Sequence, residues 1–338
     1  MPVDRRRIEA RVRLNRLAIG GWSAQTLFAA NRLGVFDLLC DGRALTAAEV
    51  ARELGTEEDS TARLLGALAA LDLVEHRDEQ FCNSRAAEDF LVSGRPESLA
   101  TWVALIGDWN QTFAQLGESV RTGEPAEVPE EHLGRSPEYT RRFIIGMHDY
   151  AIGPGRELAR HLDLEGRRRL LDPGGGPGTY SILLAEANPG LTCTVFDLPE
   201  VVEIAREVIA EHDLEDRVST AAGDYHSDEF PTGYDVALVS NTLHQEDWDT
   251  CVAILRKAHD ALEPGGLAVV QAMFLNERGD GPLWPALHNL LMLLVYRGGR
   301  AYSVEQTFRM LEEAGFQHPE IHRMSPFNAG SFVTATRA

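Results

Sequence analysis

Glycine and aspartate residues between positions 172 and 197 are spaced as in a nucleoside-binding site. Glycines stand at 174, 175, 176 and 178, directly after an apolar run that ends in Asp172. Glycine has no Cβ atom, so such a loop can turn tightly and bring its backbone against a ligand. Asp197 follows the last glycine by 19 residues, and a carboxylate at this separation can accept hydrogen bonds from both hydroxyls of a ribose. The pattern predicts a nucleoside ligand.

The spacing of the glycines argues against a dinucleotide. The dinucleotide fingerprint G-x-G-x-x-G would need a glycine where the sequence has Thr179. The observed pattern, D-x-G-x-G-x-G from Asp172 to Gly178, resembles the first motif of class I S-adenosylmethionine-dependent methyltransferases. In that family the loop packs on the methionyl part of the cofactor. The resemblance therefore implies S-adenosyl-L-methionine, which carries no diphosphate.

Alternating strands and helices are expected around this motif. A strand that ends at Asp172 precedes a helix over about 179–188, and a second strand, 191–196, brings Asp197 to the carboxyl edge of a sheet. We expect further strands at 218–222, 234–240, 267–274 and 331–336, helices at 200–212, 246–262, 287–294 and 303–314, and a turn at 263–266. This order predicts an α/β fold with a doubly wound, mostly parallel seven-stranded sheet and an antiparallel strand at its end.

The first third of the chain is predicted to be mainly helical and to contain a winged helix. Helices are expected over about 7–39, then a helix that is capped by Thr46 and ends at Gly55, a second helix over 59–71 and a hairpin over 74–83. A protein that binds duplex DNA needs a basic surface that contacts the phosphates. Residues 43–89 instead hold five arginines and eleven acids, and the second helix has one basic residue, Arg63. We expect this region to pack on protein and not on nucleic acid.

Composition narrows the partners and the compartment. The 338 residues have a formal net charge of −20, which disfavours nucleic acid and anionic membranes and favours a neutral or cationic small molecule. The four cysteines form no C-x-x-C pair, and the histidines and acids do not cluster at ligand spacing, so neither a disulfide framework nor a metal site is expected. The longest apolar stretch, 283–296, is too short to span a bilayer. We expect a cytoplasmic protein.

Longer stretches of the chain resemble one family. They are LNRLAIGGWSAQTLFAANRLGVFDLL, LLDPGGGPGTYS, FDLPEVV, GDY, NTLHQEDWDTC, LEPGG and GGRAYS. These segments are similar to the small-molecule O-methyltransferases of plant caffeate and bacterial polyketide pathways, which are typically homodimers. The resemblance implies a winged-helix dimerisation domain (1–97), a helical linker and pocket lid (98–163) and an S-adenosylmethionine-binding domain (164–338). The cofactor residues that it implies are Asp172, Gly174, Gly176, Gly178, Asp197, Leu198, Asp224, Tyr225 and Ser240. In this resemblance Asp197 binds the ribose, Asp224 and Tyr225 frame the adenine, and Gly174 and Gly176 line the methionyl part.

The resemblance also implies that His244 is the general base. It would follow a strand at the cofactor crevice, where a neutral imidazole can take the proton of a phenol. In the plant enzymes two acids hold this imidazole, but the matching positions here are Gln271 and Ala301. Glu246 or Asp247 is the alternative source of a carboxylate for this imidazole, but both begin the next helix and are expected to serve its N-terminal dipole. Either His244 acts alone on an acceptor that ionises easily, or the acceptor needs no base and catalysis is mainly positioning.

The acceptor pocket is expected among aromatic, sulfur-containing and polar residues. They are Trp109, Phe143, Met147, His288, Asn289 and Met292. His288 and Asn289 stand amid apolar neighbours, so they should bond to each other and the backbone, or contact the substrate. We expect methyl transfer to a hydroxyl of an aromatic or polyketide-like molecule in secondary metabolism. The alternatives are transfer to carbon or nitrogen, a cofactor-retaining hydroxylase or cyclase, and a regulator that senses a ligand through the winged helix.

Overall fold

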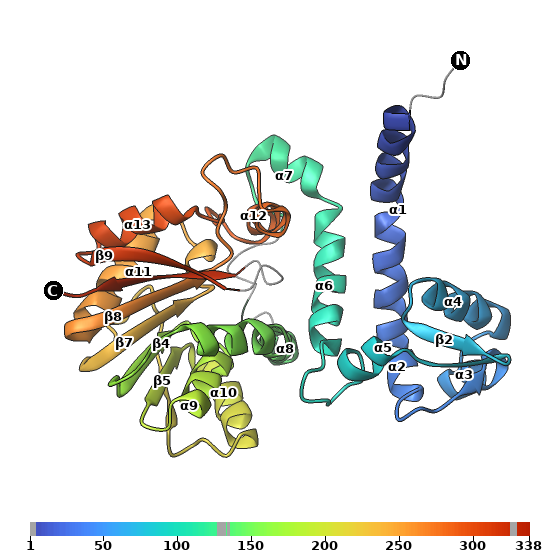
Figure 1. The fold of residues 1–338 in the computed structure, drawn as a ribbon, viewed down its shortest axis with the longest axis horizontal. Coiled ribbons are helices and arrows are strands. Elements are labelled where there is room, and N and C mark those ends of the chain that lie inside the picture. The colour runs from blue at the N-terminus through green and yellow to red at the C-terminus, as the bar shows by residue number, and fades with distance from the viewer. Residues whose placement is uncertain (1–4, 127–132, 134–135, 325–329) are drawn as a thin grey trace. The chain divides into compact units, whose positions relative to one another are not determined.

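A computed structural model describes residues 5–126, 133, 136–324 and 330–338. The chain divides into two compact units, residues 1–110 and 111–338 (Figure 1). The division into 1–97, 98–163 and 164–338 stays a prediction. No described helix is long and apolar enough to cross a membrane.

The first unit is mainly helical and holds a small three-stranded sheet of order β1-β3-β2. Its elements are α1 (Arg5–Leu33), α2 (Val35–Leu38), β1 (Leu45–Thr46), α3 (Ala47–Leu54), α4 (Glu58–Ala70), β2 (Val74–Arg77), β3 (Gln80–Asn83), α5 (Arg85–Phe90) and α6 (Ala100–Phe113). The predicted caps are confirmed: the Thr46 side chain accepts from Glu49 N in a capping box, and Gly55 ends α3 in the left-handed conformation. On α4, Arg63 forms an ion pair with Asp59.

The second unit alternates strands with helices. Its elements are α7 (Leu116–Thr122), α8 (Pro137–His161), β4 (Arg169–Pro173), α9 (Thr179–Ala187), β5 (Thr192–Asp197), α10 (Pro199–Glu211), β6 (Val218–Ala222), β7 (Tyr234–Ser240), the 3-10 helix η2 (Leu243–Gln245), α11 (Trp248–Ala261), β8 (Leu262–Ala272), α12 (Leu283–Val295), α13 (Val304–Glu313), β9 (Gln317–Arg323) and β10 (Ser331–Thr336). The predicted α/β class is confirmed.

The seven strands form one sheet of order β6-β5-β4-β7-β8-β10-β9. The first five strands are parallel, and an antiparallel strand, β10, is present as predicted, but it lies between β8 and the edge strand β9 and not at the end of the sheet. The chain leaves β4 towards β5 and β6 on one side and later fills β7 and β8 on the other. The carboxyl end of β4 is therefore the point where the strand order reverses, which is where open α/β sheets bind ligands.

Helices cover both faces of this sheet (Figure 1). Successive strand residues point to opposite faces, so Leu170 packs with α8, α9 and α10 whereas Leu171 packs with α11 and α13. Strand β7 repeats this alternation with Leu238 and Val239. Burial on both faces makes the inner strands almost wholly apolar and fixes their register, which holds the carboxyl ends at one edge.

The structure corrects the predicted turn at 263–266 and two helix starts, since α12 begins at Leu283 and not at 287, and it adds one strand. The predicted turn at 263–266 lies within β8, where the register with β7 shifts between Tyr234 and Val236. The helix expected from 246 begins at Trp248, because η2 precedes it. Strand β9 was not located by pattern: its sequence, QHPEIHR, is polar, since it pairs with β10 on one side only and its other edge is exposed.

Candidate active site

Asp197 ends β5 with both carboxylate oxygens held by backbone amides. Gly176 N donates to Oδ2 and Leu198 N donates to Oδ1, each at 2.8 Å. The residue is 9% exposed, and burial raises the pKa of its carboxyl to about 6, an effect that the two amide donors oppose. A carboxylate has about four lone-pair positions, so each oxygen can accept a further hydrogen bond.

The glycine loop has the close approaches that its composition predicts. Gly174 and Gly176 have φ values of 68° and 55°, which L side chains rarely adopt. A Cβ at Gly174 would lie 3.0 Å from Thr242 Oγ1 and 3.5 Å from a ring carbon of Tyr225. A Cβ at Gly176 would have no neighbour within 4 Å, so it would enter the open space in front of the loop.

Asp172 lies beneath this loop. Its side chain accepts from Ser181 Oγ at 2.7 Å, and a Cβ at Gly175 would lie 2.6 Å from its carboxyl carbon. Its other oxygen, Oδ1, is buried without a hydrogen-bond partner among the described residues. Burial, and secondarily the charge of Asp197, raises the pKa of Asp172 to about 7. The carboxyl is thus half-protonated near neutral pH.

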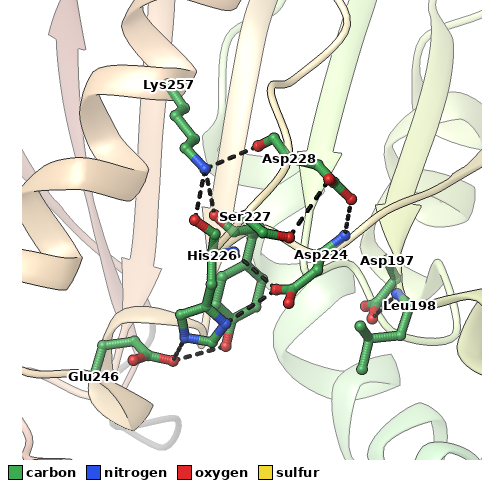
Figure 2. Close-up of polar contacts among 9 residues, drawn as sticks. Asp197, Leu198, Asp224, His226, Ser227, Asp228, Glu246 and Lys257 are labelled. Atoms are coloured by element: carbon green, nitrogen blue, oxygen red, sulfur yellow. Dashed lines mark hydrogen bonds and ion pairs between the residues drawn. The ribbon is translucent and has the colours of Figure 1, made fainter.

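The turn after β6 carries Asp224 and Tyr225 into a polar network (Figure 2). Tyr225 Oη donates to Glu246 Oε1 at 2.8 Å, and His226 Nε2 lies 3.1 Å from the same oxygen. His226 Nδ1 lies 3.0 Å from Asp224 Oδ1. Burial and the charge of Glu246 raise the pKa of Tyr225 far above its ordinary value, so its hydroxyl remains a donor.

This network corrects one prediction and confirms another. Asp247 does cap α11, because its side chain accepts from Thr250 N at 2.9 Å. Glu246 does not serve the helix terminus: its carboxylate accepts from Tyr225. The sequence offered no local signal for this contact, because its two partners are 21 residues apart.

Ser240 and Gln271 bind each other across β7 and β8. Ser240 Oγ donates to Gln271 Oε1 at 2.7 Å, and Asn241 Nδ2 donates to the same oxygen at 2.7 Å. The Ser240 hydroxyl, which is predicted to bind the cofactor, therefore donates its hydrogen bond to a neighbouring strand of the sheet. Asn241 was missed: it has a φ of 53°, and its Oδ1 is buried without a hydrogen-bond partner among the described residues.

His244 lies on η2 against a second histidine. Its ring meets that of His288 edge to face, with centroids 4.6 Å apart and planes at 84°. Burial, and then the neighbouring His288, hold the pKa of His244 well below its ordinary value. Within the described part of the chain no carboxylate is hydrogen-bonded to this ring. Its backbone oxygen accepts from Arg300 N at 2.9 Å, which joins η2 to the segment after α12.

Helix α12 brings His288 and Met292 one turn apart and so onto one face. Met292 is buried, and burial lowers the pKa of His288 to about 4. His288 Nδ1 is buried without a hydrogen-bond partner in the region that the structure covers. Of the two alternatives predicted for Asn289, the structure shows a bond to the backbone: its Oδ1 accepts from Ala301 N at 2.8 Å.

The remaining predicted pocket residues lie on two helices. Phe143 and Met147 are one turn apart on α8, the first buried and the second half-buried. Trp109 belongs to the first unit, where it packs edge to face with Trp102 at a centroid distance of 5.8 Å. Contact of these residues with an acceptor stays a prediction. Among the residues that the structure describes, no group of three or more metal-binding side chains is found.

Two known protein domains match successive parts of the chain. The sequence profile of an O-methyltransferase domain matches residues 113–317, and that of an O-methyltransferase dimerisation domain matches residues 15–93. A 3-hydroxy-5-methyl-1-naphthoate 3-O-methyltransferase from Streptomyces sahachiroi is 34% identical over 331 residues, covering 96% of this chain and 95% of the relative. An L-tyrosine C(3)-methyltransferase from Streptomyces lavendulae is 30% identical and covers 91% of this chain and 87% of the relative.

A solved structure agrees over the whole length. Human N-acetylserotonin methyltransferase in complex with S-adenosylmethionine superposes with a TM-score of 0.90 at 27% identity. The match covers 100% of this chain and 99% of that one.

Proposed function

The chain belongs to the O-methyltransferase family and contains that family's dimerisation domain, and we propose that it methylates an acidic hydroxyl of an aromatic or polyketide-like molecule. The enzyme is an S-adenosylmethionine-dependent methyltransferase. The observation that carries the proposed site is the Asp197 carboxylate, held by Gly176 N and Leu198 N in front of an open glycine loop.

The residues at the sheet edge fit S-adenosylmethionine. When bound, this cofactor supplies an electrophilic methyl group on a sulfonium. Asp197 would accept hydrogen bonds from the ribose, and the space that a Cβ at Gly176 would fill would hold the methionyl part. The unpartnered oxygens of Asp172 and Asn241 follow neighbouring strands, β4 and β7, and would suit the amino group of the methionyl part.

The environment of His244 favours an acceptor that gives up its proton easily. A free phenol has a pKa of about 10, and this imidazole has a pKa well below 6.5. Moving the proton from such a phenol to His244 would cost about 5 kcal/mol or more, at 1.36 kcal/mol per pKa unit. A hydroxyl para to a ring carbonyl ionises more easily, because the negative charge of its anion is delocalised onto the carbonyl oxygen. His244 and His288 would then position the oxygen and receive its proton.

The test is methyl transfer from ¹³C-methyl-labelled S-adenosylmethionine to a panel of aromatic acceptors. The panel pairs hydroxyls para to a ring carbonyl with matched phenols that lack this carbonyl. We expect O-methyl products, detected by NMR and mass spectrometry, mainly from the activated members. Equal turnover of both sets would contradict the acidic-hydroxyl proposal, and absence of binding to S-adenosylhomocysteine would contradict the proposed cofactor site.

Transfer to carbon is a second candidate. His244 has no hydrogen-bonded carboxylate within the described residues, and an activated ring carbon can attack the methyl group before any proton leaves. One relative, the L-tyrosine C(3)-methyltransferase, is named for such a reaction. The same NMR measurement separates a carbon-bound from an oxygen-bound methyl group.

We propose that the enzyme is a homodimer formed through its first unit. Large apolar side chains on α1 are exposed, among them Leu17 at 68% and Trp22 at 74%. Exposed apolar side chains of this size along a helix of 29 residues are typical of an interaction surface. We expect Leu17→Glu with Trp22→Glu to shift the mass measured by light scattering from dimer to monomer. An unchanged mass would contradict this interface.

A further inference from the structure

The sequence contains a single lysine, Lys257, and the other 31 of its 32 basic residues are arginines. Lys257 lies on α11 and directs its ammonium group at the turn after β6 (Figure 2). Its Nζ donates to the backbone oxygens of Tyr225 at 3.0 Å, His226 at 3.0 Å and Asp228 at 2.8 Å.

The acceptors of Lys257 belong to one helical turn. Asp228 N donates to Asp224 O at 2.8 Å, and the Asp228 carboxylate accepts from Asp224 N at 2.8 Å. The last carbonyls of a helical turn have no partner within it and form a partial negative pole. A cation at this end satisfies them and fixes the turn.

An ammonium group suits this position better than a guanidinium. Lysine has three N–H donors that diverge around one nitrogen, and here all three are used. The donors of arginine lie in one plane and suit flat, paired acceptors such as carboxylates. Three converging carbonyls therefore explain why lysine stands here in a chain that otherwise uses arginine.

The same turn is held on its other side by side chains. Glu246 accepts from Tyr225 Oη, and the Tyr225 ring lies near Gly174 of the glycine loop. Figure 2 shows Asp224 between His226 and Asp197. The backbone of the turn is thus anchored by Lys257, and its side chains face the edge at which Asp197 stands.

We propose that Lys257 is a positioning residue that holds the turn at 224–228 so that Asp224 and Tyr225 recognise the adenine of the cofactor. This inference rests on the proposed function, because it assumes a nucleoside on Asp197. Because all three Nζ donors of Lys257 are used on backbone oxygens of the turn, Lys257 would act through Asp224 and Tyr225 and not on the cofactor itself. Its loss should therefore affect recognition of the base and leave the chemical step nearly unchanged.

The test compares two nucleosides on three variants. Lys257→Met keeps the aliphatic stem and removes the donors, and Lys257→Arg keeps the charge but changes the donor geometry. Arg256→Met is the matched control, because Arg256 is the adjacent cation on α11 and donates to Glu313 O on another element. Calorimetry measures the binding of S-adenosylhomocysteine and of S-inosylhomocysteine, in which oxygen replaces the adenine amino group.

We expect wild type to prefer S-adenosylhomocysteine. Lys257→Met should lower the affinity for S-adenosylhomocysteine by about tenfold or more, which is the effect of losing one hydrogen bond to a charged group. The affinity for S-inosylhomocysteine should fall by less than about threefold. Lys257→Arg should recover at most part of the loss, and Arg256→Met should match wild type. With saturating S-adenosylmethionine, kcat of Lys257→Met should stay within about threefold of wild type while KM for the cofactor rises.

Three results would overturn the proposal. Equal weakening of both nucleosides by Lys257→Met, together with a lower kcat and melting temperature, would make Lys257 a general structural support. Full affinity in Lys257→Met would show that the turn needs no ammonium. Wild type that binds neither nucleoside would contradict the proposed cofactor site itself, whereas the first two results would leave that site intact.

Discussion

The proposed cofactor edge, around Asp197, and the proposed acceptor side, around His244, satisfy their polar groups differently. At the cofactor edge two carboxylates are paired in advance, because Asp197 accepts from two backbone amides and Glu246 accepts from Tyr225, while Asp172 and Asn241 each keep one oxygen without a partner among the described residues. On the acceptor side, His244 meets His288 only through its ring, and His288 Nδ1 has no partner among the described residues. A ligand that never changes can have a preformed site, whereas groups left open can adapt to different acceptors. This contrast leads to four predictions.

The largest effect should come from the preformed side. We expect Asp197→Ala to weaken S-adenosylhomocysteine by about 10²- to 10⁴-fold in calorimetry, because two hydrogen bonds to a charged group contribute roughly 1.5–3 kcal/mol each. The control is Glu200→Gln, which removes a nearby exposed charge and should change affinity little. A loss below about tenfold for Asp197→Ala would mean that the site is not organised around this carboxylate.

Substitution of His244 on the acceptor side should lower the rate of methyl transfer and leave the affinity for the cofactor unchanged. We expect His244→Ala to lower kcat by about 10²-fold, the lower end of the range for a general base, because its low pKa makes it a weak base. S-adenosylhomocysteine should bind as to wild type, and the melting temperature should be kept. A rate loss under about fivefold would exclude His244 from the base role and would favour catalysis by positioning alone.

A smaller effect should appear in stability at the cofactor edge. Burial raises the pKa of Asp172 to about 7, so the stability that its protonated form contributes is lost as the pH rises through 7. Between pH 5.5 and 8 this loss amounts to about 2 kcal/mol. As the pH rises from 5.5 to 8, the free energy of unfolding of Asp172→Asn, measured with urea, should therefore increase by about 2 kcal/mol relative to that of wild type. A difference that does not vary with pH would contradict the perturbed carboxyl.

The smallest effect should be the pH dependence of cofactor binding. The pKa of Asp197 is raised by burial to about 6, and the ribose requires the ionised form. S-adenosylhomocysteine should bind about tenfold more weakly at pH 5 than at pH 7.5. His288 should not contribute, because burial lowers its pKa to about 4, below this pH range. Loss of this dependence in Asp197→Asn would assign it to the carboxyl.

Sequence reasoning succeeded where the signal is local. Gly174, Gly176 and Asp197 were located because a tight loop and the end of the next strand leave a fixed spacing. The contacts of Glu246 and Lys257 were missed because they join segments 20 to 32 residues apart and depend on how α11 packs. Gln271 was recognised as lacking a carboxylate, but its partners, Ser240 and Asn241, became visible only once β7 and β8 were paired.

The hydrogen bond from Arg300 N to His244 O has a consequence for how this enzyme can diversify. The anchor uses backbone atoms only, and a Cβ at Gly299 would lie 3.1 Å from the same oxygen. Side chains on α12 other than His288 and Asn289 can therefore be exchanged without releasing the histidine, provided that residue 299 stays small. Natural drift or laboratory selection could retune the accepted molecule through positions such as 292 while methyl donation is inherited unchanged.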